Sequence, residues 1–407
     1  MSADLAELYR DLHRHPELSF AETRTAAVAA GRLRAAGYEV TEGVGGTGVV
    51  GVLRNGTGPV ALLRADMDAL PVAEDTGLDY ASTARGTARD GEDTAVAHAC
   101  GHDMHVTCLA GAAAELASTP DTWTGTLLVV FQPAEEIGGG AHAMLDDGLL
   151  DRFGVPDVVL GQHVAPLPAG VLAVASGAAF AGSDTVRVTL HGSGGHGSRP
   201  ETTVDPVLLA AATVLRLHTV VSREVAATET AVLGVGMLRA GTKENIVPES
   251  AELGLTVRSY TPAVRERVLG AVRRIVRGEA AAAGAPRDPE VRVVETFPPV
   301  VNDAAAVERT RAALATATPL PVVDPGPVTG SEDVGAFATA AGAPCVYWLL
   351  GGGDPAVFAG ASTVDEIRDR VADLPSNHSP RFAPVIEPTL STGVAALVAA
   401  AREWLRP

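Results

Sequence analysis

TLLVVF at residues 126–131 is an uncharged apolar run of strand length, and a proline follows it two residues later. VALLR at 60–64 and DVVL at 157–160 are similar runs, bounded by Gly, Pro or Asp. Such runs are typical of strands buried on both faces of a parallel sheet. Residues 104–118 have the composition of a helix. The alternation predicts an α/β domain, in which helices cover a central, mostly parallel sheet.

A different pattern begins near residue 183. TVRVTL at 185–190 alternates in polarity, as expected of a strand with one buried face. Asp205-Pro206 and Thr261-Pro262 each place a side-chain oxygen before a proline, which is typical of a helix start. Further strands are predicted at 230–238, 250–258 and 291–295. The order strand, helix, strand, strand, helix, strand is that of a ferredoxin-like module.

These two patterns predict that one domain is inserted in another. The α/β pattern resumes after about residue 300, so its domain is expected to consist of two segments. We expect the larger domain at 1–182 and 299–407, with the inserted domain at 183–298. A chain of 407 residues is long enough for more than one domain.

The composition excludes some classes of protein. Asp and Glu total 49 against 31 Lys and Arg, for a net charge of -18, which argues against nucleic acid as a partner. Three cysteines are too few for a disulfide framework and favour a reducing compartment. The N-terminus lacks the apolar segment of a signal peptide, and no apolar stretch is long enough to span a membrane. We therefore expect a cytoplasmic protein without a membrane partner.

The strongest chemical signal is HACGHDMH at residues 98–105. It concentrates three imidazoles, a thiol and a carboxylate in a chain with only 11 His and 3 Cys. Thiolate and imidazole are good ligands for Zn and similar divalent ions. In an extended loop, Cys100 and His102 could face the same point, because Gly101 between them has no side chain. The alternative is a buried cysteine beside surface histidines.

A second signal is FQPAEE at residues 131–136, directly after a predicted strand. Open α/β sheets place their sites at the carboxyl ends of strands. Of the adjacent acids Glu135 and Glu136, one can bind a metal while the other acts as a base toward water. The alternative is a solvated turn.

Ligand-type side chains follow other predicted strands as well. Asp66 and Asp68 follow the strand at 60–64, and His163 follows the strand at 157–160. His378 lies far away in the sequence, in PSNHSPRF. A single histidine is more often structural than a ligand, but several such residues at separate strand ends indicate one shared site.

These motifs resemble those of the M20 metallopeptidase/amidohydrolase family. The HACGHDMH form is similar to that of N-acyl amino acid amidohydrolases, a subgroup that includes hippurate hydrolases, aminoacylases and auxin-conjugate hydrolases. The similarity runs from about residue 5 to the C-terminus and is carried by these stretches: HRHPELSF at 13–20, RADMDALPV at 64–72, HACGHDMH, FQPAEE, HGSGGHGSRP at 191–200, NIVPE at 245–249, GSEDVGAFA at 330–338 and NHSPRF at 377–382. Residues 84–97 depart from it by a few extra residues, which we interpret as a tolerated surface-loop insertion.

The resemblance implies a site for two divalent metal ions in the larger domain. The metal ligands that it implies are Cys100, His102, Glu136, His163 and His378. It implies that Glu135 is the general base and acid and that Asp68, with Asp66, supports the site, Asp66 having no ligand role. Zn and Mn are the expected ions, and the resemblance also allows Ni and Co.

For the inserted domain, the resemblance implies a dimerisation and lid role. His196 matches a residue that reaches the partner subunit's site and helps to hold the oxyanion. Asn245 and Arg258 match positions that bind the substrate's free carboxylate. A homodimer or higher homo-oligomer is therefore expected, although the apolar helix at 207–221 is also compatible with an ordinary core.

The implied reaction is hydrolysis of an N-acyl amino acid, a small-molecule substrate, to a carboxylic acid and a free amino acid. Two alternatives remain at this stage. One is a metallo-exopeptidase, or dipeptidase, of the same superfamily, which would prefer a free amino terminus. The other is a catalytically silent member that only binds metal or ligand.

Overall fold

The computed structural model describes residues 2–361 and 363–406, which form two compact units. The first unit comprises the chain up to Ala179, Val300–Pro327 and the chain from Asp333 onward. The second unit comprises Phe180–Pro299 and Val328–Glu332. The predicted insertion at 183–298 lies inside the second unit, which also includes the short segment at 328–332. Side chains hold that segment there: Arg258 Nη1 donates to the Thr329 carbonyl at 2.6 Å, and the Tyr260 hydroxyl donates to the Val328 carbonyl at 2.9 Å.

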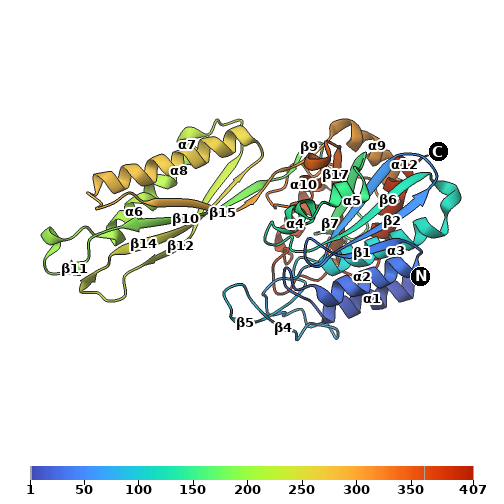
Figure 1. Ribbon diagram of the computed structural model, residues 1–407, viewed down its shortest axis with the longest axis horizontal. Helices are drawn as coiled ribbons and strands as arrows, with labels where there is room; N and C mark the ends of the chain where they lie inside the picture. The colour runs from blue at the N-terminus through green and yellow to red at the C-terminus, as the bar shows by residue number, and fades with distance from the viewer. Residues whose placement is uncertain (1, 362, 407) are drawn as a thin grey trace. The chain divides into compact units, whose positions relative to one another are not determined.

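The first unit is built on a seven-stranded sheet (Figure 1). Its strands, in spatial order, are β1 (Glu39–Val44), β2 (Gly48–Asn55), β6 (Gly125–Gln132), β3 (Val60–Asp66), β7 (Val158–Pro168), β17 (Cys345–Gly353) and β8 (Leu172–Ala173). The central strands β6, β3, β7 and β17 are parallel, whereas β1, β2 and β8 pair antiparallel with their neighbours. The predicted α/β class with a large parallel sheet is confirmed, and the antiparallel strands lie toward its edges.

Helices cover both faces of this sheet (Figure 1). Leu63, Leu127 and Val129 point into a core that is shared with helices α1, α2, α3, α9 and α12. The alternate residues Leu62 and Leu128 are fully buried as well, which explains why the strands read as continuous apolar runs. The helices are α1 (Ser2–Arg14), α2 (Thr23–Ala35), α3 (His102–Ser118), α4 (Gly140–Asp146), α5 (Leu149–Phe153), α9 (Ala304–Leu314), α10 (Gly335–Ala341), α11 (Val364–Asp373) and α12 (Thr389–Trp404).

Strand connectivity brings the predicted motifs to one edge of the sheet. β6 and β7 lie on opposite sides of β3 and run parallel to it. Asp66 pairs with Gln132, and the register of β3 with β7 puts His163 at nearly the same level. The carboxyl ends of these strands therefore meet where the chain crosses from one side of β3 to the other, the usual place for a site in such sheets.

The second unit has a four-stranded antiparallel sheet. Its strands, in spatial order, are β12 (Ala231–Ala240), β14 (Ser250–Ser259), β10 (Gly182–His191) and β15 (Glu290–Phe297). Val186, Leu253 and Leu255 face a core that is formed with α6 (Pro206–Leu217), α7 (Thr219–Glu224) and α8 (Pro262–Ala282). The side chains of Asp205 and Thr261 cap α6 and α8 as the sequence predicts.

One local expectation was wrong. The apolar helix expected at 207–221 is two helices, which are separated at His218. There the Thr219 hydroxyl donates to the Arg216 carbonyl, a side-chain bond that competes with regular helix continuation. Residues 84–97 include a short hairpin of β4 (Arg85–Thr87) and β5 (Asp93–Ala95). Four further short strands pair outside the main sheets: β11 (Gly195–His196) with β13 (Ile246–Val247), and β16 (Val300–Asn302) with β9 (Gly177–Phe180). No helix of residues 2–361 and 363–406 is both long and apolar enough to cross a membrane.

Candidate metal centre

The motif at 98–105 forms the turn into α3 rather than the extended loop that we expected. Gly101 precedes the helix with φ of 83°, and His102 is its first residue. A Cβ at Gly101 would lie 2.4 Å from Val164 Cγ1, so both the backbone conformation and the space require glycine. The tight turn places Cys100 and His102 on one side of the helix start.

His102 presents one nitrogen to the site. Its Nδ1 lies 2.8 Å from the Asp68 carbonyl oxygen and donates to it, so Nε2 is the nitrogen that remains to bind a metal. His102 Nε2 and Glu136 Oε1 are 3.7 Å apart. Both atoms are buried and have no hydrogen-bond partner among the described residues. Two buried polar atoms that lie this close without a hydrogen-bond partner are compatible with a cation between them.

His163 is oriented in the same manner. Its Nδ1 donates to the Val164 carbonyl at 2.8 Å, and its Nε2 lies 3.5 Å from Cys100 Sγ. The neighbouring His105 is not available as a ligand. Its Nε2 accepts the Val164 N–H at 2.8 Å, and its Nδ1 donates to Asp66.

Glu136 and His378 form the other side of the site. Glu136 Oε2 lies 3.4 Å from His378 Nε2. His378 has φ of 72°, and its backbone N–H donates to the Ala99 carbonyl at 2.8 Å, which ties it to the turn before α3. Asn377 adds a second tie, because its Nδ2 donates to the carbonyls of Cys100 and Val164, both at 3.1 Å. The structure thus brings all five predicted ligands together.

The five ligand-type residues fall into overlapping groups. Cys100, His102 and His163 form one group, and Cys100, Glu136 and His378 form another, so that the thiol belongs to both. In a tetrahedral Zn site, neighbouring ligand atoms are separated by about 3.4 Å for N and O and by about 3.6 Å for N and S. The Glu136–His378 and Cys100–His163 separations of 3.4 and 3.5 Å match these values. The residues therefore fit two adjacent divalent ions.

Burial shapes the protonation of these groups. Burial, together with Asp68 and Asp66, raises the pKa of Glu136 to about 8. Burial and the nearby Glu136 carboxyl raise the pKa of the Cys100 thiol well above its usual range. Burial and His105 hold the pKa of His163 well below its ordinary value, so this imidazole is neutral and ready to bind a metal.

Asp68 acts on the site through the backbone. Its Oδ1 accepts the N–H of Glu135 and its Oδ2 accepts the N–H of Glu136, both at 3.0 Å. Ser19 Oγ donates to Oδ2 at 2.6 Å. Asp68 is therefore a positioning residue for the two glutamates, and Glu135 Oε2 lies 4.0 Å from His102 Nε2.

A buried ionic network beneath the site was not predicted from the sequence. Arg64 is 1% exposed and donates to Asp66 at 2.6 Å and to Asp333 at 2.9 Å. Gln132 Nε2 donates to both oxygens of Asp333. Although burial opposes its charge, His102, Arg64 and His105 hold the pKa of Asp66 well below its usual range. Both Asp66 oxygens are engaged, by His105 and Arg64, which agrees with its having no ligand role.

The remaining predicted residues lie in the second unit. His196 pairs with Ile246, and the N–H of Gly197 donates to the Asn245 carbonyl at 2.9 Å, so His196 and Asn245 are neighbours. Both side chains are exposed. Arg258 lies near the opposite end of β14 from Ser250, where its Nη1 also donates to Ser331 Oγ at 2.9 Å. The unit does not bring Arg258 together with His196 and Asn245.

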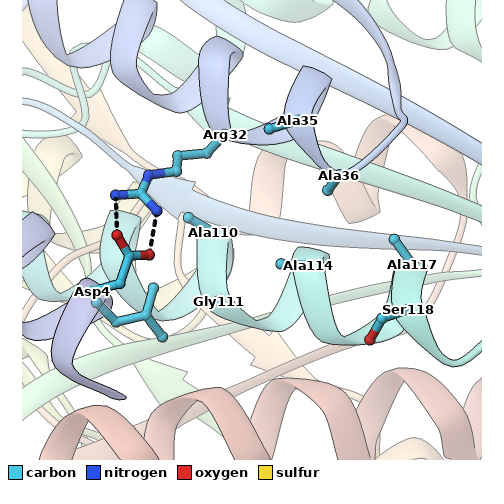
Figure 2. Close-up of a pocket in the computed structure, with 10 residues that line it drawn as sticks. Asp4, Arg32, Ala35, Ala36, Ala110, Gly111, Ala114, Ala117 and Ser118 are labelled. Atoms are coloured by element: carbon cyan, nitrogen blue, oxygen red, sulfur yellow. Dashed lines mark hydrogen bonds and ion pairs between the residues drawn. The ribbon is translucent and has the colours of Figure 1, made fainter. Parts of the chain in front are cut away.

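A separate hollow of about 380 Å³ in the first unit has no histidine or cysteine among the residues that line it. Figure 2 shows it beside the ion pair of Asp4 and Arg32, with small side chains such as Ala110 and Ala114 from α3. It lies along the later turns of α3, whereas His102 is at the start of that helix.

Comparisons with known proteins agree with this geometry. The sequence matches the profile of peptidase family M20/M25/M40 over residues 62–379. It is 37% identical to thermostable carboxypeptidase 1 of Saccharolobus solfataricus, covering 85% of each chain, and 38% identical to hippurate hydrolase of Campylobacter jejuni, covering 76% of this chain and 77% of the other. The structure is similar to that of the Bacillus subtilis YXEP protein, a dinuclear metal binding peptidase of the M20 family, with a TM-score of 0.78, 28% identity, and coverage of 99% and 98%. The chain therefore belongs to peptidase family M20/M25/M40.

Proposed function

We propose that the chain is a metal-dependent amidohydrolase that cleaves N-acyl amino acids to a carboxylic acid and a free amino acid. The observation that carries this proposal is the cluster of five ligand-type side chains with Glu135 at its side. The hippurate hydrolase among the relatives is named for an activity of this kind, which supports the assignment.

Two divalent ions held by Cys100, His102, Glu136, His163 and His378 would acidify a water molecule and polarise the amide carbonyl. Glu135 accepts the proton of that water as the C–O bond forms. It then returns the proton to the amine nitrogen as the C–N bond breaks. Asp68 keeps Glu135 in place throughout this cycle, because its carboxylate accepts the backbone N–H of Glu135.

The donor set bears on which ion is bound. A thiolate and imidazoles favour Zn or another late divalent ion, and the carboxylate tolerates Mn. Cys100 belongs to two of the ligand groups, so its thiolate would be within reach of an ion held by either group. Cys100 and Cys108 are free thiols and are buried, which supports our proposal that the enzyme works in a reducing, cytoplasmic compartment.

The second unit supports a proposal of dimerisation. Its element order and its strand order, β12-β14-β10-β15, are those expected of a ferredoxin-like module. Leu208 and Leu215 on α6 are 70% and 74% exposed, and β12 is an edge strand. A second copy that covers this surface would remove both the apolar side chains and the strand edge from water.

Dimerisation also resolves the separation of the substrate-binding residues. From Ser250 to Arg258, β14 spans about 26 Å at about 3.3 Å per residue. Arg258 and the pair His196 and Asn245 therefore contact the same small substrate only if they come from different subunits. We propose that Arg258 binds the substrate carboxylate in its own subunit, while His196 holds the oxyanion and Asn245 contacts the substrate in the partner's site.

An exopeptidase is the second candidate, because a carboxypeptidase is among the relatives. Both candidate substrates have a free α-carboxylate, so the blocked or free amino terminus distinguishes them. The test is amino acid release from N-acetyl, N-benzoyl and longer N-acyl amino acids and from matching dipeptides, using metal-stripped protein with and without Zn or Mn. Metal-dependent release from the acylated substrates supports the amidohydrolase. Faster release from dipeptides supports the exopeptidase, and no release with any ion contradicts both.

A further inference from the structure

Three non-glycine residues of the described chain have a left-handed backbone, and two of them share one hydrogen-bond acceptor. Phe20 has φ of 63° and Ala134 has φ of 50°. The N–H of Phe20 donates to Glu22 Oε1 at 2.9 Å, and the N–H of Ala134 donates to the same oxygen at 2.8 Å. The left-handed conformation costs a residue with a Cβ about 1–2 kcal/mol of conformational free energy. Such a conformation persists only where the surroundings impose it. Glu22 is fully buried and supplies that constraint.

The residue after Ala134 is the proposed general base. The N–H groups of Ala134, Glu135 and Glu136 are consecutive, and all three donate to buried carboxylates: the first to Glu22 and the next two to Asp68. The Ser19 hydroxyl bonds the same Asp68. The segment from Ser19 to Glu22 therefore holds the turn at 134–136 at two points.

The far side of the turn is equally constrained. The carbonyl of Ala134 accepts the N–H groups of Gly139 and Gly140. A Cβ at Gly140 would lie 1.5 Å from the Pro133 carbonyl oxygen, so the chain passes itself closely there. With these contacts fixed, the bond from Glu22 to the Ala134 N–H is the one that holds the left-handed residue in place.

We propose that Glu22 is a positioning residue that sets the direction of Glu135 through the N–H of Ala134. This inference rests on the proposed function, which makes Glu135 the general base. Relaxation of Ala134 from φ of 50° to the ordinary helical value of about -63° rotates the backbone by about 110° and moves the next side chain. A displacement of about 1 Å at a reacting group is enough to lower turnover about 100-fold.

Glu22 has a structural role as well, which the experiment must separate. It directly precedes α2, and its Oε2 accepts the Thr47 hydroxyl. Glu22→Leu removes every acceptor while filling the space, whereas Glu22→Gln retains Oε1 for the two N–H groups. Thr47→Val removes only the contact to Oε2 and serves as the matched control.

We expect Glu22→Leu to lower kcat about 10- to 100-fold with KM changed less than about threefold. The kcat of Glu22→Gln should lie within about threefold of that of the original protein. The kcat of Thr47→Val should equal that of the original protein. Equal kcat values for Glu22→Leu and the original protein would overturn the proposal, as would a Gln variant as impaired as the Leu variant.

Hydrogen–deuterium exchange of metal-free protein gives a readout that does not depend on activity. In Glu22→Leu, the amides of residues 134–136 should exchange at least about tenfold faster, while those of α12 keep their rate. Equal acceleration in α12 would show general destabilisation and overturn the proposal, as would an unchanged rate at the turn. If the original protein cleaves no N-acyl amino acid, the proposed function fails, and the exchange experiment still reports whether Glu22 holds the turn.

Discussion

Cys100 Sγ lies 3.5 Å from His163 Nε2, at the centre of the ligand cluster and within two of its groups. A thiol with a raised pKa is protonated at neutral pH, and only a bound cation gives it the charge of a ligand. Metal binding by this chain should therefore depend on Cys100 and should release protons.

Cys100→Ala should weaken binding of Zn by at least about tenfold, because it removes a ligand from both groups. Cys108→Ala is the matched control, since Cys108 is also a buried free thiol but lies outside every ligand group of the described residues. Metal content after equilibration with a chelating buffer measures the difference. Equal Zn content in the two variants would refute thiolate ligation.

Arg64→Met should destabilise the protein by about 3–5 kcal/mol, because it leaves the buried carboxylates of Asp66 and Asp333 without their cation. Arg54→Met is the control. Arg54 is also an arginine of the sheet, but it is exposed and pairs with Glu39 at the surface, so its loss should change the free energy of unfolding by less than about 1 kcal/mol. Urea unfolding of both variants measures these changes, and similar values would contradict the role assigned to Arg64.

The stability contributed by His13 should decrease at high pH. Burial opposes its charge, but Asp103 at 2.6 Å and Glu74 at 3.0 Å outweigh this and raise its pKa to about 10. A group whose pKa is higher in the folded state stabilises fully below its unfolded pKa of about 6.5, and this stabilisation is lost as the pH rises toward 10.

His13→Gln should therefore have its largest effect on the free energy of unfolding near pH 6 and a progressively smaller one at pH 8 and 10. Each pH unit in this window corresponds to at most about 1.4 kcal/mol. Denaturant unfolding of the metal-loaded protein and the variant at the three pH values measures the trend. A difference that stays constant or grows with pH would show that His13 is not held as a cation.

The proposed use of residues from two subunits predicts complementation. Arg258→Ala and His196→Ala proteins should each be inactive as homodimers. In a mixed dimer, the subunit with His196→Ala keeps its own Arg258 and receives an intact His196 from its partner, so one of the two sites is complete. A statistical mixture should therefore regain about a quarter of the original activity. No recovery after coexpression of the two variants would contradict the shared site.

Much of the fold and of the site could be predicted from the sequence because the signals are local. The apolar runs at 60–64 and 126–131 are strands, and the ligand-type residues that follow them meet because parallel strands end at one edge. The start of α3 was misplaced by two residues, since the left-handed Gly101 turns the chain directly into the helix.

Contacts between distant segments could not be predicted in this way. Arg64 appears in the sequence as the charged end of an apolar strand, and its partner Asp333 is 269 positions away. Glu22 precedes a helix in an ordinary manner, and only the folded chain shows its bond to Ala134, which is 112 positions away. Such residues act through tertiary contacts, for which periodicity and spacing give no signal.

The central claim is that this chain hydrolyses N-acyl amino acids with Glu135 as the base, and that the reaction requires divalent ions, which the five ligand-type residues would hold. The most direct test is glycine release from N-benzoylglycine by metal-stripped protein that is titrated with Zn or Mn, with Glu135→Gln measured in parallel. We predict that release rises with added ion until two ions are bound per subunit, and that Glu135→Gln binds the same amount of metal but turns over about 10²–10⁴-fold more slowly. Release that survives complete metal removal, or a Glu135→Gln variant with near-normal turnover, would contradict the account.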